Sequence, residues 1–110
     1  MMSMPQIPEP VASFLERVNA HDEEAFLDAF TPAGAVDDWG RTFTGREQIA
    51  TWSGREFIGS RGNLTVEEVE ATGNTVTVIG DWRSNHANGR STFVFEIDGD
   101  KLAKMTIREG

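Results

Sequence analysis

Carboxylates are frequent in this sequence, which has 18 Asp and Glu residues, but the other common nucleophiles, metal ligands and proton carriers are scarce. The chain has no cysteine and no tyrosine, and its two histidines, His21 and His86, lie far apart. A thiolate nucleophile, a disulfide framework and a cysteine metal site are therefore excluded, and the remaining acids and histidines show no metal-ligand spacing. No phosphate-binding loop or dinucleotide-binding fingerprint occurs. We expect neither a metal ion nor a cofactor.

The adjacent carboxylates Asp37 and Asp38 and the imidazole of His86 remain as groups that could move a proton. His86 has the same parity as Trp82 along a predicted strand. If that face points inward, His86 lies at the mouth of an interior space, where it could pair with a carboxylate. The alternative for all three is a solvated position beside a turn, because Asp is common in turns and the turn signal Asn88-Gly89 follows His86.

Three predicted helices in the first half of the chain must position these groups. Apolar residues at positions 11, 14, 15 and 18 have the i, i+3, i+4, i+7 spacing of one helical face. Asp22 is a suitable N-cap for a second helix, whose first turn is acidic. The run Thr44-Gly45-Arg46-Glu47 has the form of a capping box and opens a third helix. Two short strands are predicted between these helices, over residues 35–39 and 41–44.

The second half of the chain changes to a period of two. This alternation predicts successive antiparallel strands over residues 64–72, 75–85, 90–97 and 102–108, separated by turns. Helices followed by a strand meander predict an α+β domain, in which a curved antiparallel sheet wraps around three N-terminal helices as a cone with an internal pocket. We assign residues 1–7 to a flexible leader and residues 8–110 to this single domain.

Composition restricts the partners. The formal net charge is −8, and the arginines are spread among acids and apolar residues, so we expect no nucleic-acid binding. No apolar run approaches the roughly 20 residues needed to span a bilayer, and the first residues lack the pattern of a signal peptide. We therefore expect no membrane association and a cytoplasmic location.

Five segments resemble the nuclear transport factor 2-like superfamily, and within it the SnoaL-like and ketosteroid-isomerase-like branch. They are FLERVNAHD at 14–22, AFLDAFTP at 25–32, AVDD at 35–38, TGREQI at 44–49 and FVFEIDGDKL at 93–102. The resemblance covers roughly residues 8–108. It implies a small hydrophobic molecule as ligand and a homodimer formed through the outer face of the sheet. Members include isomerases, cyclases, dehydratases, epoxide hydrolases and pure binding proteins, so the fold by itself assigns no reaction.

The resemblance also implies site residues. Asp38 takes the position of the general base in the ketosteroid-isomerase-like enzymes, with His86 as a candidate partner. Phe14 and Phe93 take the positions of the tyrosine and the protonated acid that donate hydrogen bonds to the oxyanion in those enzymes. Because a phenyl ring donates no hydrogen bond, the sequence argues against ketosteroid isomerase activity.

Aromatic residues are predicted to surround the interior of the cone. Ring edges that line an unfilled cavity suit a flat hydrophobic ligand, whereas closely packed rings form only a core. The candidate ligand-binding residues are Phe14, Trp39, Trp52, Trp82, Phe93, Phe95 and Met105. Two functions remain open: a binding protein that performs acid–base chemistry of the isomerase, cyclase or dehydratase type, and a non-catalytic dimeric binding module whose pocket is filled.

Overall fold

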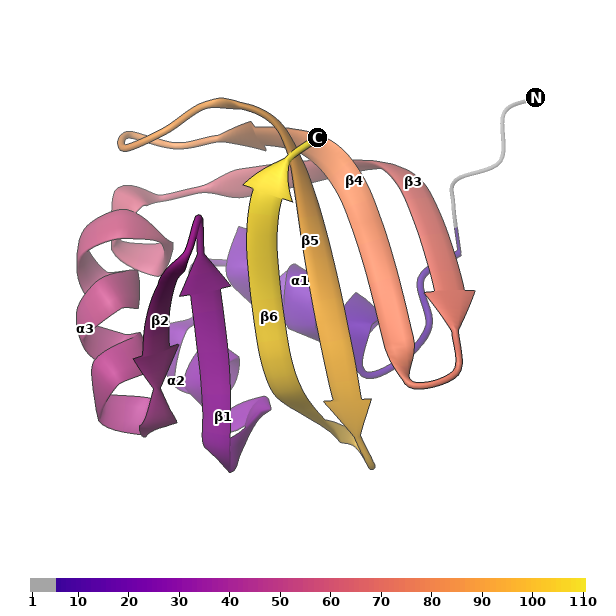
Figure 1. Ribbon diagram of the computed structural model, residues 1–110. Coiled ribbons are helices and arrows are strands. Elements are labelled where there is room, and N and C mark those ends of the chain that lie inside the picture. Colours follow the sequence, from indigo (N-terminus) through magenta and orange to yellow (C-terminus); the bar gives the residue numbers. More distant parts are fainter. Residues whose placement is uncertain (1–5) are drawn as a thin grey trace.

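The first two helices form as their apolar spacing predicts. The computed structural model describes residues 6–110 and begins with α1 (Val11–Asn19) and α2 (Glu23–Asp28) (Figure 1). The apolar side of α1 is buried, and the Asp22 carboxylate caps α2 by accepting a hydrogen bond from the Ala25 N–H at 3.2 Å. Residues 1–5 of the predicted leader lie outside the described residues, and Ile7 packs against the core.

The third helix, α3 (Gly45–Glu56), forms at its predicted place but is capped differently. The Thr44 side chain makes no capping hydrogen bond; instead, the Thr44 N–H donates to Gln48 Oε1 at 2.9 Å. The reciprocal partner is thus one position later than the capping-box pattern predicts. A short 3-10 helix, η1 (Ile58–Ser60), follows α3 and leads into the sheet.

Six strands form one sheet in the order β2-β1-β6-β5-β4-β3. Their bounds are β1 (Phe30–Asp38), β2 (Arg41–Thr44), β3 (Asn63–Thr72), β4 (Thr75–Arg83), β5 (Gly89–Asp98) and β6 (Lys101–Glu109). The predicted antiparallel meander is confirmed for β3 to β6, whereas β1 joins β6 in parallel. β1 starts at Phe30, whereas the sequence predicted its start at residue 35.

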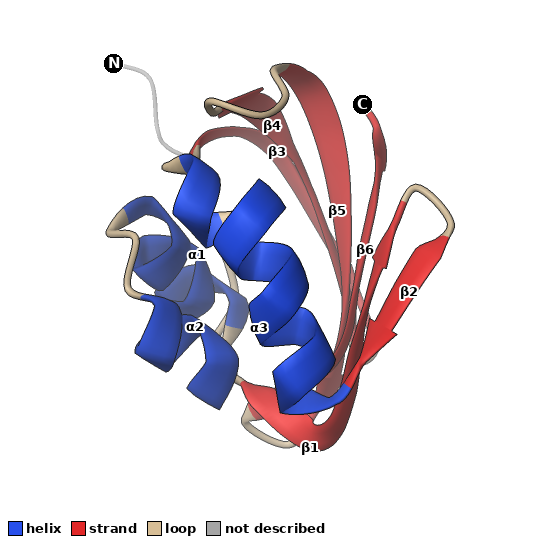
Figure 2. Ribbon diagram, turned by 90° about the vertical axis from the view of Figure 1, so that its left-hand side faces the viewer, coloured by secondary structure: helices blue, strands red, loops and turns tan. Residues whose placement is uncertain are grey.

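The helices cover one face of the curved sheet (Figure 2). Alternating residues of each strand point toward the helices, so the confirmed cone fold buries apolar side chains from both layers. The largest fully buried side chains are Val11, Phe14, Val18, Phe26, Val36, Ile49, Val76, Val78, Phe93, Phe95, Leu102 and Met105.

Irregularities in the sheet shift residues from the simple alternation. A bulge between Val66 and Glu68 lies opposite Gly80, where a Cβ atom would approach the Thr65 carbonyl oxygen to 2.3 Å. A second shift, between β5 and β6, turns Leu102 rather than Ala103 toward the core. Between β4 and β5 the chain forms a longer loop over residues 84–88, in place of the tight turn that Asn88-Gly89 predicts.

Candidate functional site

A cavity of about 220 Å³ opens between α3 and the inner face of the sheet. Its walls come from the β1–β2 hairpin, α3, the β4–β5 loop, β5 and β6. Five polar side chains line it: Asp38, Arg41, Glu56, His86 and Ser91. Because polar and aromatic side chains meet in one concave space, this cavity is the candidate site of the protein.

Four aromatic rings stack in a column, and three of them, Trp52, Phe57 and Trp82, line the cavity. Phe43 stacks on Trp52 with ring centroids 5.8 Å apart, Trp52 on Phe57 at 4.9 Å, and Phe57 on Trp82 at 4.7 Å. Phe57 is therefore covered on both faces, so its edge is the part of the ring that can face the cavity. Gly62 packs against Trp82, since a Cβ atom there would lie 2.0 Å from the indole ring.

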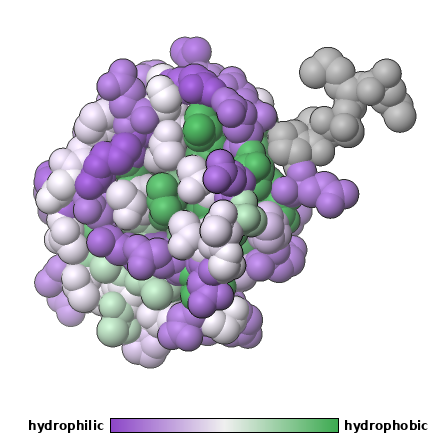
Figure 3. Space-filling model, turned by 45° about the vertical axis from the view of Figure 1, so that its right-hand side comes forward, coloured by the Kyte–Doolittle hydropathy of each residue, from purple (hydrophilic) through white to green (hydrophobic). Residues whose placement is uncertain are grey.

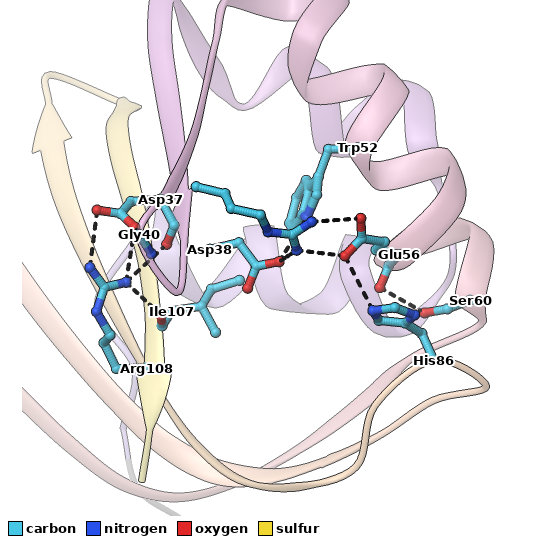
Figure 4. A network of polar contacts seen from close by, with 10 residues as sticks. Asp37, Asp38, Gly40, Trp52, Glu56, Ser60, His86, Ile107 and Arg108 are labelled. Carbon is cyan, nitrogen blue, oxygen red and sulfur yellow. Dashed lines mark hydrogen bonds and ion pairs between the residues drawn. The ribbon is translucent and has the colours of Figure 1, made fainter.

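Asp37 and Asp38 point to opposite sides of β1 (Figure 4). Asp37 faces away from the cavity, where Arg108 donates hydrogen bonds to it at 3.0 and 3.1 Å and the Gly40 N–H donates at 2.8 Å. The hydrogen bond from Arg108, and next the one from Gly40, lower the pKa of the Asp37 carboxyl. Asp37 thus anchors the hairpin that presents Asp38.

Asp38 turns into the cavity and is fixed through one of its two oxygens. Oδ2 accepts a hydrogen bond from Trp52 Nε1 at 3.0 Å and another from Arg41 Nη2 at 2.5 Å. Within residues 6–110, no hydrogen bond reaches Oδ1. The Asp38 side chain is 14% exposed. The carboxylate is therefore oriented through Oδ2 by two donors, and Oδ1 is left without a donor among the described residues.

Arg41 connects Asp38 to a second acid on α3. Its Nη2 and Nη1 donate to Glu56 Oε1 at 2.6 Å and Oε2 at 3.0 Å, so both Glu56 oxygens are occupied. The hydrogen bonds from Arg41 lower the pKa of Glu56, although burial opposes them. His86 Nε2 lies 3.2 Å from Glu56 Oε1 (Figure 4). The order of contacts is Asp38, Arg41, Glu56, His86.

The structure separates the predicted site residues into two groups. Asp38, Trp39, Trp52, Trp82, His86 and Phe93 line the cavity. Phe14, Phe95 and Met105 are buried in the core beyond the cavity wall, because their rings and side chains pack against other core residues. His86 reaches the mouth from the β4–β5 loop, and its partner is Glu56 rather than Asp38.

Arg41, Glu56 and Phe57 are the site residues that sequence reasoning missed. The sequence could have indicated Arg41. The two residues Trp39-Gly40 between two short predicted strands form a hairpin turn, which places Asp38 and Arg41 opposite each other. Glu56 is the last residue of α3, and nothing in the local pattern distinguishes it from the other exposed acids. In the part of the chain that the structure describes, no group of three His, Asp or Glu side chains converges on a metal position, and no helix is long and apolar enough to cross a membrane.

The curved sheet, the helices on its inner face and the cavity between them define a protein of the nuclear transport factor 2-like fold class. The SnoaL-like domain family matches residues 11–105. The chain therefore belongs to the SnoaL-like domain family. No curated protein matches the sequence.

Solved structures of similar fold include proteins with different described roles. A putative polyketide cyclase from Sinorhizobium meliloti has a TM-score of 0.81 at 19% identity, over 93% of this chain and 95% of that chain. SalBIII, an epoxide hydrolase/cyclase-like enzyme in pyran ring formation in polyether salinomycin, has a TM-score of 0.80 at 19% identity, over 91% and 87%. A hypothetical protein with a ketosteroid isomerase-like fold from Catenulispora acidiphila, in complex with trimethylamine, has a TM-score of 0.76 at 19% identity, over 96% and 88%. At these identities the likeness establishes the fold and not the reaction.

Proposed function

We propose that this protein binds a small hydrophobic molecule in the cavity and transfers a proton on it, with Asp38 as the general base. The observation that carries the proposal is the Asp38 carboxylate, which faces the cavity with Oδ2 fixed by Trp52 and Arg41 and Oδ1 available. A general base needs this arrangement, because the proton must be taken by an oriented lone pair within hydrogen-bond reach.

The size of the cavity limits the bound part of the molecule. A dry cavity of about 150 Å³ admits benzene, so the space of about 220 Å³ suits one substituted ring or a short branched chain. Ring edges of Phe57 and its neighbours supply apolar contacts. The fit of this space to a small ligand agrees with the trimethylamine complex of a protein of the same fold.

The available donors favour proton removal from a hydroxyl over enolisation. Phe14 and Phe93 provide no hydrogen bond for an oxyanion, and the Arg41 hydrogen bonds are directed at Asp38 and Glu56. Oδ1 of Asp38 would take the proton of a ligand hydroxyl or of a water molecule. The oxygen that loses this proton would at the same time attack a carbon of the ligand. The leaving oxygen would then take a proton from solvent or from His86, which lies at the same mouth. A cyclisation by a hydroxyl or an epoxide-opening reaction has this form, and SalBIII is an epoxide hydrolase/cyclase-like enzyme of the same fold.

Asp38→Asn and Asp98→Asn provide a matched pair of variants for the test, because Asp98 is an exposed residue at the end of β5 and does not line the cavity. We would screen hydrophobic epoxides and hydroxy-carbonyl compounds for binding by ¹H–¹⁵N NMR and for turnover by mass spectrometry. Asp38→Asn should bind hits but lose turnover by about 100-fold or more, the typical contribution of a general base. Asp98→Asn should retain both binding and turnover. Equal turnover by wild type and Asp38→Asn would refute the assignment.

A second candidate function is non-catalytic binding. The observation that favours it is the ion pair with Arg41, which holds Asp38 without any substrate. In that case hits should bind with NMR shifts at the cavity, and no compound of the screen should be converted. Binding shifts confined to the helical surface would contradict both candidates.

We also propose a homodimer through the outer face of the sheet. Small, β-branched side chains that are neither fully buried nor fully exposed share this face: Thr77, Ile79, Thr92, Val94 and Thr106. Figure 3 shows apolar side chains interspersed with polar ones on this side of the molecule. Sedimentation velocity should give a dimer at micromolar concentration and a monomer for Val94→Arg. A monomeric wild type would refute the proposal.

A further inference from the structure

A second hollow continues outward from the cavity. It has a volume of about 490 Å³ and shares four lining residues with the inner space: Trp39, Trp82, Ala87 and Ser91. The remainder is lined by Asn88, Gly89, Arg90, Glu109 and Gly110. We call this space the outer groove. Because these four residues line both spaces, the outer groove adjoins the cavity.

Trp39 is displayed at the junction under conformational strain. It is 59% exposed, more than any other large hydrophobic residue in the described part of the chain, and its φ is +55°. The left-handed region disfavours a bulky side chain, and the hairpin turn at this place normally takes Asn or Gly. Strained residues persist where the surroundings fix them, often at functional sites. Trp39 is fixed in this way, because its N–H donates to the Ile107 carbonyl at 3.2 Å.

The charges of the outer groove disfavour an anionic ligand. Arg90, the one cationic side chain lining this groove within residues 6–110, already pairs with Glu67 at 3.0 Å and with Glu68. Glu109 adds a further negative charge. A phosphate, sulfate or carboxylate would therefore find no unengaged cation here.

The other polar groups of the groove can bond to a neutral molecule. Asn88 Oδ1 accepts a hydrogen bond from the Ser84 N–H at 2.8 Å, which fixes the amide and leaves its NH₂ group as a donor. The Ser91 side chain lines both spaces; its hydroxyl donates a hydrogen bond to the Gly89 carbonyl at 3.3 Å and can still accept one from a ligand. A ring that carries C–H groups on its face and hydroxyls on its rim suits this arrangement. Its face can stack on the exposed indole, and its hydroxyls can bond to the polar groups beside the indole.

We propose that the outer groove binds a neutral hydroxylated ring, such as a sugar, attached to the apolar group held in the inner cavity, with Trp39 stacked on that ring. The proposal rests on the proposed function of the cavity, because the apolar end of the same molecule enters there. Trp39 then sets specificity for the outer end of the ligand, whereas Asp38 acts on the inner end.

Matched phenyl ethers test the proposal on the full chain. Anisole occupies the cavity alone, and phenyl β-D-glucopyranoside adds the hydroxylated ring. Cyclohexyl phenyl ether adds an apolar ring, and phenyl sulfate adds an anion. Dissociation constants come from ¹H–¹⁵N NMR titrations that include the indole N–H signals of the three tryptophans. Trp39→Phe identifies the Trp39 signal and retains a ring, and Trp39→Ala removes the ring.

The glucoside should bind wild type about three- to tenfold more tightly than anisole, which is the range for one aromatic contact. Trp39 also lines the inner cavity, so Trp39→Ala should weaken the binding of both compounds, but it should weaken the glucoside more and so abolish its advantage. Trp39→Phe should retain part of that advantage. The proposal is overturned if the glucoside has no advantage, if the cyclohexyl ether or the sulfate gains as much, or if Trp39→Ala weakens anisole equally. If anisole fails to bind while the glucoside shifts the Trp39 signal, the inner cavity proposal fails and the outer groove stands; if neither binds, both fail.

Discussion

The contact between Arg41 and Glu56 allows a quantitative test of the site. We would measure a double-mutant cycle with Glu56→Gln, Arg41→Gln and the double variant, because Gln preserves much of the shape and removes the charge. A hydrogen bond to a charged group contributes about 1.5–3 kcal/mol when well buried. Arg41 is 52% exposed and Glu56 20%, so solvent screens the pair and lowers the value toward that of surface pairs. We expect a coupling free energy of about 1 kcal/mol at pH 7.

The pH dependence of this coupling has a defined sign. The pKa of Glu56 is lowered in the folded protein by its hydrogen bonds with Arg41. Its contribution is therefore complete above the unfolded pKa of about 4.3, and it is lost as the pH falls from there through the folded pKa. The stability difference between wild type and Glu56→Gln should shrink below about pH 4.

Urea unfolding followed by circular dichroism from pH 7 to pH 3 supplies the free energies of unfolding. The exposed pair Arg83–Asp81, 2.9 Å apart with side chains 69% and 34% exposed, serves as the control and should couple more weakly. A coupling at Arg41–Glu56 no larger than that of the control, or one that stays constant down to pH 3, would refute the assigned network.

Three further changes test the cavity wall and its supports. Gly62→Ala should destabilise the protein by about 1–3 kcal/mol in thermal unfolding and shift the Trp82 indole NMR signal, because the new methyl group meets that ring at 2.0 Å; an unshifted signal would contradict the packing. Gly54→Ala, in α3 with open space around its Cβ position, should stabilise by about 0.5–1 kcal/mol in the same assay, and a loss of stability would show that the helix is not as described. Asp37→Asn should be less stable than wild type at pH 7. The difference in the free energy of unfolding should shrink as the pH falls below about 4, because the pKa of Asp37 is lowered in the folded state. A difference that grows at acid pH, measured by urea unfolding, would contradict this reasoning.

The fold follows from the sequence because its signals are local. Each signal determines the structure of its own short segment: the apolar spacing in α1, the N-cap Asp22, and the alternation in β4 and β5. The structure has these elements at the predicted places. The details that differ depend on neighbours. The register shifts appear only when β3 pairs with β4 and β5 pairs with β6. The conformation of the loop after β4 is fixed by hydrogen bonds between Ser84 and residues 86–88.

The site is less predictable, because its contacts join distant elements. Asp38 could be selected through the family resemblance, and Arg41 follows it across one turn. Glu56 meets them only because α3 lies along the hairpin, and His86 reaches Glu56 from a loop on the other side of the mouth. The two-residue alternation that predicted the orientation of His86 ends with β4 at Arg83, so it does not apply to this loop. Partner choice among acids therefore required the tertiary structure.

The one parallel pairing of the sheet has a consequence for how the site is assembled. β1 carries Asp38 near the start of the domain, and its neighbour β6 is the last strand of the sheet, with Asp37 opposite Thr106. Contacts between residues so distant along the chain close slowly, because the intervening loop entropy must be overcome first. On the ribosome, the hairpin with Asp38 and Arg41 has to wait for β6 before the cavity has its Ile107 wall. We expect the cavity to be completed only after β6 has paired with β1.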